Sequence, residues 1–216
     1  LIGRKPEPGS EWNDADNRWD YAHRLGRLLR RDFPQLRITL GNSLACSELI
    51  AEGLRRGFPE EYADYLGLEV VGRSSLPERQ WEGALQGGEL MLQTARRFGY
   101  QRWKLNACYE SNYRLDALLG QRRQAEWYVR DLLLSQAWGF RDIFIGIMFD
   151  VGNSYANSFW GSTGLCTRAP YTYPKKSYVA VAFATKMLDQ VVGRKAIPTG
   201  SESVYAQEFT RRDGDV

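Results

Sequence analysis

Two predicted β-strands in this chain end on acidic residues that could take part in chemistry. Residues 103–113 are a short, apolar-leaning run that predicts a strand ending on Glu110, and residues 142–150 are a nearly continuous apolar run ending on Asp150. A strand that ends on an acid directs its carboxylate into the cleft above the sheet, where α/β proteins hold their ligands. A helical pattern over residues 124–138 separates the two strands. The acids are therefore expected at one edge of an α/β sheet.

The rest of the chain alternates between helix and strand patterns. Apolar spacing predicts helices over residues 17–33, 47–56, 81–98, 125–138 and 176–192, and strands over residues 35–40, 66–71, 103–109 and 143–149. The first residues, to about position 8, would be the tail of a further strand. Strands that alternate with helices pair in parallel through right-handed crossovers, which predicts an α/β fold with either a barrel or a doubly wound sheet.

The number of strand–helix units favours part of a barrel. A closed (β/α)8 TIM barrel needs eight strands and about 250 residues, whereas this chain of 216 residues holds five units. We therefore expect residues 1–195 to contain strands 4–8, the C-terminal part of a TIM barrel, with strands 1–3 upstream of Leu1. The chain begins with leucine rather than methionine, and we expect both ends to be cut from something longer. An incomplete sheet would expose two parallel edges, so we expect the chain to need the missing N-terminal barrel half or to self-associate.

A β-rich accessory segment is predicted after the barrel part. Residues 201–215 alternate polar and apolar side chains and end in an Asp-Gly turn, which is typical of the first strand of a hairpin. We place this segment at residues 196–216, after a linker that begins near residue 194.

Composition and cysteine spacing argue against several partners and cofactors. The 29 basic and 26 acidic residues give a net charge of +3, which provides no reason to expect nucleic acid as a partner. No run approaches the roughly 20 apolar residues of a membrane span, and the first residues of the chain do not show the basic-then-apolar pattern of a signal peptide. The three cysteines, Cys46, Cys108 and Cys166, lack the spacings of metal sites. We expect no membrane partner, no metal and no cofactor, and the compartment stays undetermined.

A second group of acids lies before the first predicted helix, in Glu7-Pro-Gly-Ser-Glu-Trp12. This segment resembles the Glu-x-Gly-Asn-Glu-Pro/Trp strand-end motif of retaining glycoside hydrolases in the clan A, or four-seven, superfamily of TIM barrels. Further segments resemble that family in order and spacing, over roughly residues 1–195 in total. They are residues 62–71 (its sixth strand), 105–110 (its seventh strand), 149–150 (its eighth strand), 159–165 (the loop after it) and 174–180 (the entry to its last helix).

The resemblance implies a catalytic pair of Glu11 and Glu110. Glu11 would be the general acid/base at the end of the fourth strand, and Glu110 the nucleophile at the end of the seventh. A retaining hydrolase cleaves O-glycosidic bonds by double displacement, in which one carboxyl protonates the leaving oxygen while the other attacks the anomeric carbon. Glu11 would need a raised pKa, through burial or the like charge of Glu110. Glu7 is an alternative acid.

The resemblance also implies a carbohydrate partner, namely an oligosaccharide, a polysaccharide or a glycoside. Flat, C–H-rich faces of sugar rings pack on aromatic rings. The candidate substrate-binding residues are Ser10, Trp12, Asn13, Tyr113, Asp150 and Trp160. Asp150 could bind a sugar hydroxyl or the acid/base, or it could cap a loop. Two positions depart from the family pattern, because Ser10 replaces an asparagine and Arg73 follows the sixth strand in place of a histidine and a tyrosine.

Two other functions stay open. One is a non-catalytic carbohydrate-binding or scaffold relative with a degenerate barrel. The other is a different strand-end-acid barrel enzyme, such as a metal-dependent lyase or an aldolase, which would need a clustered carboxylate/histidine site or a lysine at a strand end. Lys104 begins its predicted strand, and His23, the only histidine, lies within a predicted surface helix. The sugar and the linkage are not indicated.

Overall fold

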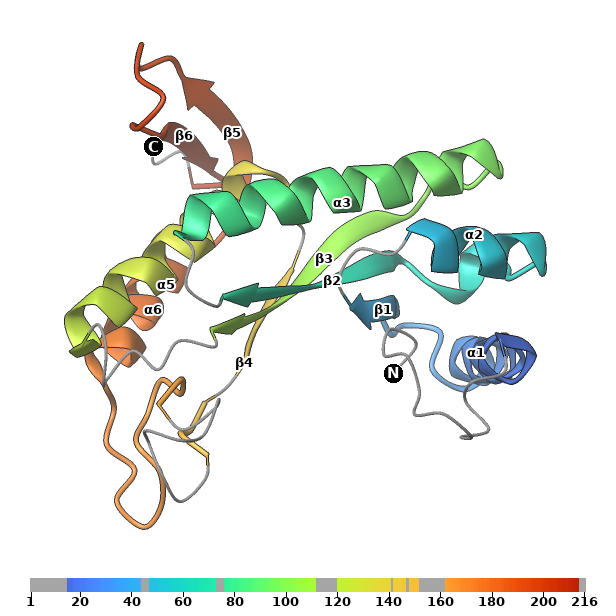
Figure 1. The fold of residues 1–216 in the computed structure, drawn as a ribbon, viewed down its shortest axis with the longest axis horizontal. Coiled ribbons are helices and arrows are strands. Elements are labelled where there is room, and N and C mark those ends of the chain that lie inside the picture. Colours follow the sequence, from blue (N-terminus) through green and yellow to red (C-terminus); the bar gives the residue numbers. More distant parts are fainter. Residues whose placement is uncertain are drawn as a thin grey trace. The chain divides into compact units, whose positions relative to one another are not determined.

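Helices and strands alternate along the chain (Figure 1). The computed structural model describes residues 15–43, 47–72, 76–111, 120–140, 142–146, 148–151 and 162–213, apart from the side chains of residues 15–17, 42–43, 71–72 and 108–111. The elements are α1 (Ala15–Asp32), β1 (Thr39–Ser43), α2 (Ser47–Arg55), the short 3-10 helix η2 (Glu60–Tyr62), β2 (Tyr65–Gly72), α3 (Pro77–Arg97), β3 (Lys104–Ser111), α5 (Gly120–Ala137), β4 (Ile143–Gly146), α6 (Lys176–Met187), β5 (Val191–Ile197) and β6 (Ala206–Arg211).

Strands β1 to β4 form one sheet whose strand order follows the sequence, β1-β2-β3-β4. Strands β1 and β2 are parallel, with Thr39 opposite Tyr65 and Leu40 opposite Leu66. Helices lie between successive strands in the sequence, as parallel pairing requires. Strands β5 and β6 form a separate antiparallel pair. The predicted α/β class is therefore confirmed, whereas the numbering of the strands as 4–8 of a barrel stays a prediction.

The chain divides into two compact units. The first contains Leu1–Val70 and Glu82–Cys108, and the second contains Val71–Trp81 and Tyr109–Val216. Helix α3 contributes its first residues to the second unit and the rest to the first.

The first unit is built around β2 and β3. Leu66, Leu68 and Leu105 are buried in these strands. A Cβ atom at Gly88 would lie 2.7 Å from Cδ1 of Leu105 and 2.9 Å from Cδ1 of Leu68. A glycine inside a helix costs about 1 kcal/mol relative to alanine. At Gly88 this cost is offset because α3 can approach the two strands closely.

Two carboxylates accept hydrogen bonds near the amino ends of the strands in the first unit. Asp64, just before β2, accepts hydrogen bonds from the backbone N of Ile38 and from Nη2 of Arg30, both at 2.8 Å. Burial raises the pKa of Asp64, but these two donors outweigh burial and the pKa lies below its usual value. Glu60 accepts the backbone N–H of Arg102, at 2.6 Å, just before β3. Charged groups at this end of a barrel sheet usually serve stability rather than chemistry.

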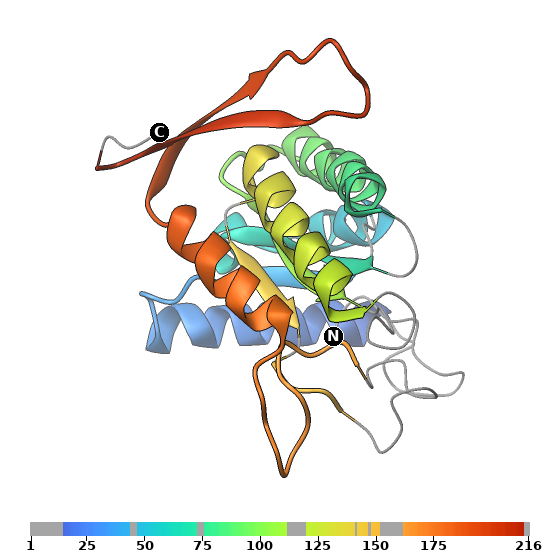
Figure 2. The ribbon, with the colours of Figure 1, turned by 90° about the vertical axis from the view of Figure 1, so that its left-hand side faces the viewer.

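The second unit contains α5 and α6, which lie side by side (Figure 2). Trp81, at the start of α3, has no exposed surface, and its ring packs edge-on against Phe140 with centroids 5.1 Å apart. Its Nε1 donates to Oδ1 of Asp131 on α5 at 2.9 Å. Arg130 pairs with Glu78 beside this contact, Nε to Oε1 at 2.8 Å. The start of α3 is thus held to α5 by a hydrogen bond and an ion pair, and to Phe140, which follows α5, by ring packing.

The C-terminal elements differ from the prediction. The helix predicted to reach residue 192 ends at Met187, and Gln190 has a positive φ of 61° that turns the chain. The next residues, Val191–Ile197, were expected to end a helix and begin a linker, but they form β5 and pair with β6 from Ile197 opposite Ala206 to Val191 opposite Arg211. The alternating segment after residue 201 is therefore the second strand of this hairpin, not the first. The predicted domain boundary at residue 196 falls inside β5, and the division into barrel and accessory parts stays a prediction.

Two details of the N-terminal elements also differ. The strand predicted over residues 35–40 starts at Thr39, because the N–H of Ile38 is taken by the Asp64 carboxylate. The apolar face predicted for the first helix buries Trp19 and Ala22 but leaves Leu25 and Leu28 exposed by 39% and 42%.

In the described part of the chain, no helix is long and apolar enough to span a membrane.

Candidate active site

Strand β3 carries Glu110 as its next-to-last residue. The prediction that Glu110 lies at the carboxyl end of a strand is confirmed. Lys104 is the first residue of the same strand, so its position is that of a strand start, as predicted. Carboxyl ends of parallel strands are where barrel enzymes place their catalytic groups.

The chain beyond β4 joins a short set of paired segments. The backbone N of Asp150 donates to the Cys166 carbonyl at 3.0 Å, and the backbone N of Cys166 donates to the Met148 carbonyl at 2.8 Å. Cys166 also bridges Pro174 on its other side. The carboxyl end of β4 is therefore continued by three segments that hold one another through backbone hydrogen bonds.

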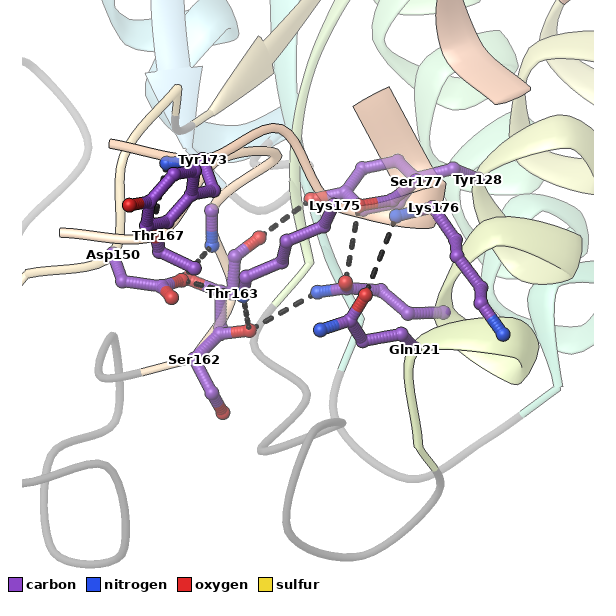
Figure 3. A network of polar contacts seen from close by, with 12 residues as sticks. Gln121, Tyr128, Asp150, Ser162, Thr163, Thr167, Tyr173, Lys175, Lys176 and Ser177 are labelled. Atoms are coloured by element: carbon purple, nitrogen blue, oxygen red, sulfur yellow. Dashed lines mark hydrogen bonds and ion pairs between the residues drawn. The ribbon is translucent and has the colours of Figure 1, made fainter. Parts of the chain in front are cut away.

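A buried ion pair joins two of these segments (Figure 3). Nζ of Lys175 is 2.8 Å from Oδ1 of Asp150, and neither side chain has exposed surface. The same Nζ donates to the Ser162 carbonyl at 3.0 Å. Oδ1 of Asp150 also accepts the backbone N–H of Gly164 at 2.8 Å. Lys175 and Asp150 thus tie together both ends of the chain segment between residues 151 and 162.

Side chains from α5 extend this network. Nε2 of Gln124 donates to the Ser162 carbonyl at 3.0 Å, and the Gln124 Oε1 accepts the Ser177 hydroxyl at 3.1 Å. The Tyr128 hydroxyl donates to the Thr163 carbonyl at 2.9 Å. All these groups are buried, where each hydrogen bond replaces one that water can no longer supply. The network therefore fixes residues 162–164 against α5 and the start of α6.

Residue 164 must be a glycine because the backbone of Phe149 and Asp150 lies too close to leave room for a side chain. A Cβ atom at Gly164 would overlap the backbone N of Asp150 and the carbonyl carbon of Phe149. This close approach also lets the Gly164 N–H donate a hydrogen bond to the Asp150 carboxylate. Asp150 therefore caps the segment at Gly164, which is the structural role predicted for it. Its burial at 3% exposure favours this role over direct contact with a sugar hydroxyl.

Among solved structures, the chain is similar to a family 39 glycoside hydrolase from the gut symbiont Bacteroides cellulosilyticus WH2. The TM-score is 0.61 at 15% sequence identity, over 97% of this chain and 51% of the other. The chain therefore shares the α/β fold, with alternating strands and helices, of part of that structure. It spans about half the length of that relative. It is also similar to the exo-β-1,4-mannosidase Op5Man5 from Opitutaceae bacterium strain TAV5, with a TM-score of 0.49 at 14% identity, over 82% of this chain and 34% of the other. Comparisons with models of protein families and with curated proteins gave no match.

Most of the predicted site residues lie outside the described part of the chain. They are Glu11, Ser10, Trp12, Asn13, Tyr113 and Trp160, together with the alternative acid Glu7 and Arg73. The backbone of Glu110 is described and its side chain is not. The catalytic and substrate-binding roles of these residues therefore stay predictions, and Asp150 is the one candidate whose surroundings are defined.

The network contains residues that the sequence analysis did not single out, above all Lys175 and Gln124. One feature of the sequence pointed to a lysine or arginine partner for Asp150. An aspartate at the end of an apolar strand requires a positive partner if it is buried. Lys175 and Lys176 are adjacent in the sequence, and nothing local tells which of them turns inward. In the structure Lys175 is 2% exposed and Lys176 is exposed.

The remaining titratable groups of the described residues do not form a metal site. No group of three or more histidine, cysteine, aspartate or glutamate side chains is close enough to hold an ion within the described ranges. His23 was predicted to lie on the surface, but it is half-buried and its ring packs edge-on against Tyr62, centroids 5.2 Å apart. Cys166 is a buried free thiol.

Proposed function

We propose that the protein is a retaining glycoside hydrolase in which Glu11 is the acid/base and Glu110 the nucleophile. The observation that carries the proposal is the position of Glu110 at the carboxyl end of β3, in a chain that has the fold of part of a glycoside hydrolase. In this proposal β1, β2, β3 and β4 are barrel strands 5–8, and the segment before α1 is strand 4. The β5–β6 hairpin begins an accessory element.

The proposed chemistry proceeds in two displacements. The Glu110 carboxylate attacks the anomeric carbon while Glu11 donates a proton to the leaving oxygen, which gives a covalent glycosyl-enzyme. Glu11 then takes a proton from water, which attacks the same carbon and releases Glu110. Ser10, Trp12, Asn13, Tyr113 and Trp160 are proposed to line the sugar site. Asp150 and Lys175 are proposed to hold residues 162–164 in place beside this site.

The product anomer tests this mechanism. A panel of aryl β- and α-glycosides is incubated with the protein, and the first product is followed by proton NMR before it mutarotates. We expect release of the anomer that has the same configuration as the substrate, because two inversions restore it. Release of the opposite anomer contradicts the double displacement. Absence of hydrolysis across the panel favours the non-catalytic carbohydrate-binding relative instead.

We also propose that the exposed apolar surfaces of both units are covered by the N-terminal half of the barrel, or by a second copy of the chain where that half is absent. In the second unit, Val179, Phe183 and Met187 recur every four residues along α6 and are 64%, 68% and 52% exposed. This spacing places them in one stripe of the helix. In the first unit, Leu25 and Leu28 of α1 are exposed, and Leu25 lines a cavity of about 220 Å³ with Leu40 of β1. Monomeric proteins seldom leave such contiguous apolar surface in water.

Self-association of the isolated chain follows from these surfaces. Sedimentation velocity of residues 1–216 is expected to show dimers or larger species, and Phe183→Glu is expected to shift the distribution toward monomer, because it places a charge in the stripe. Thr185→Glu, at an exposed position of the same helix outside the stripe, is the control and should leave the distribution unchanged. A monomeric parent chain would show that the stripe needs no cover.

A further inference from the structure

Two tyrosine rings project from a loop in the second unit. Tyr171 and Tyr173 are 70% and 64% exposed. Their rings are nearly parallel, with 10° between the ring planes and 6.4 Å between the centroids. The backbone N of Tyr173 donates to the Tyr171 carbonyl at 3.1 Å, a three-residue turn that holds the two residues beside each other. The loop therefore presents two nearly parallel aromatic rings to solvent.

Hydrogen bonds from Thr167 hold the loop in its conformation. Its hydroxyl donates to the Tyr171 carbonyl at 2.6 Å and accepts the backbone N–H of Tyr173 at 2.8 Å. Its own N–H donates to the Tyr173 carbonyl at 2.9 Å. A surface that is already ordered loses less conformational entropy when a ligand binds. Tyrosine adds to this advantage because it offers a large contact area with only two side-chain torsions.

The position of the loop relates it to the candidate active site. Cys166, which precedes Thr167, pairs with the segment that continues β4, and Pro174, which follows Tyr173, pairs with Cys166. The next residue is Lys175, the buried partner of Asp150. Figures 1 and 2 show the loop, in orange, as a hairpin that extends away from α6. It is thus anchored at the carboxyl end of β4, the end where a barrel enzyme binds its substrate.

We infer that Tyr171 and Tyr173 form an outer binding surface for a linear polysaccharide. The choice of this ligand rests on the proposed function. A pyranose ring has an apolar C–H face and hydroxyl groups around its edge, and a tyrosine offers a matching apolar face with a hydroxyl at its tip. The two rings lie close together on one loop, so the pair offers contact to more than one unit of a sugar chain. An exposed aromatic pair on a protruding loop suits a long chain that lies across it better than an enclosed small ligand.

Affinity electrophoresis tests the inference without depending on catalysis. The protein is run through native polyacrylamide gels that contain soluble β-1,4-xylan, β-1,4-mannan or mixed-linkage β-glucan. We expect at least one polysaccharide to retard it, and the double variant Tyr171→Ala/Tyr173→Ala to bind about tenfold more weakly because it lacks both ring faces. Tyr171→Phe/Tyr173→Phe should keep most of the retardation, since it retains the rings. Tyr178→Ala, at a 41% exposed tyrosine of α6, is the matched control and should migrate as the parent does.

The outcomes separate this inference from the proposed function. Loss of retardation in the alanine double variant, with unchanged hydrolysis of small aryl glycosides, supports both. Tyrosine-dependent retardation in a protein that hydrolyses none of the glycosides supports the binding surface and overturns the enzyme. Equal retardation of the parent and the alanine variant, or none by any polysaccharide, overturns the inference. Tyrosine-dependent binding to phosphatidylcholine/phosphatidylserine vesicles alone would also overturn it and indicate a membrane surface.

Discussion

Replacement of Glu110 by glutamine is expected to lower kcat for glycoside hydrolysis by about three to six orders of magnitude. Glutamine keeps the volume of the side chain but carries no negative charge, so it can neither attack the anomeric carbon nor stabilise the positive charge that develops there. The loss should be similar for all leaving groups, because the attacking group is missing in every case. Steady-state rates with a series of aryl glycosides measure it.

The matching change at Glu11 should have a different signature. Glu11→Gln removes the proton donor, which matters most for poor leaving groups and least for acidic phenols that depart without help. Glu89→Gln, on an exposed position of α3, is the control and should leave all rates unchanged. If Glu110→Gln retains more than about a tenth of the parent activity, Glu110 is not the nucleophile. If Glu11→Gln is silent and Glu7→Gln is not, the acid/base is Glu7.

Replacement of Lys175 by methionine is expected to lower the free energy of unfolding by about 3–5 kcal/mol. Methionine fills a similar volume but leaves the Asp150 carboxylate buried without the positive charge at 2.8 Å. It also removes the hydrogen bond that Nζ donates to the Ser162 carbonyl. Urea-induced unfolding, followed by tryptophan fluorescence, measures the difference.

The adjacent lysine provides a closely matched control. Lys176→Met changes the same residue type one position later, on an exposed side chain, and should alter stability by no more than about 0.5 kcal/mol. The double variant Lys175→Met/Asp150→Leu should recover part of the loss, since it removes the uncompensated charge as well. Equal effects of the two single lysine variants would show that the ion pair does not stabilise the fold.

The predicted elements that the structure bears out are those whose signals are local. Helix α3 and strands β2 and β3 lie close to their predicted positions, because the side-chain period of a helix or strand is visible within a dozen residues. The place of Glu110 at the end of β3 follows from the same local pattern. The C-terminal hairpin was misassigned for the opposite reason. Val191–Ile197 is a strand because it pairs with Ala206–Arg211, and a pairing partner cannot be read from the segment itself.

The candidate site also combines residues that local sequence patterns nominate with contacts that only the fold creates. Residue type and position at a strand end nominated Glu110 and Asp150, and resemblance to glycosidase motifs nominated Glu11. Only the folded chain decided that Asp150 is buried against Lys175, because the two residues are 25 positions apart and are brought together by the pairing of Met148–Asp150 with Cys166 and of Cys166 with Pro174. Gln124 is a second example, because its hydrogen bonds join it to Ser162 and Ser177, which are 38 and 53 positions later in the sequence.

The α/β class, the alternation of strands and helices, and the acids at strand ends follow from the sequence alone. Each of them depends on side-chain periodicity and on turn residues close by. The tertiary structure decided which lysine turns inward, which apolar residues of α1 stay exposed, and which strand pairs with β6. These choices depend on contacts between distant segments, where burial energy and charge pairing outweigh local preference.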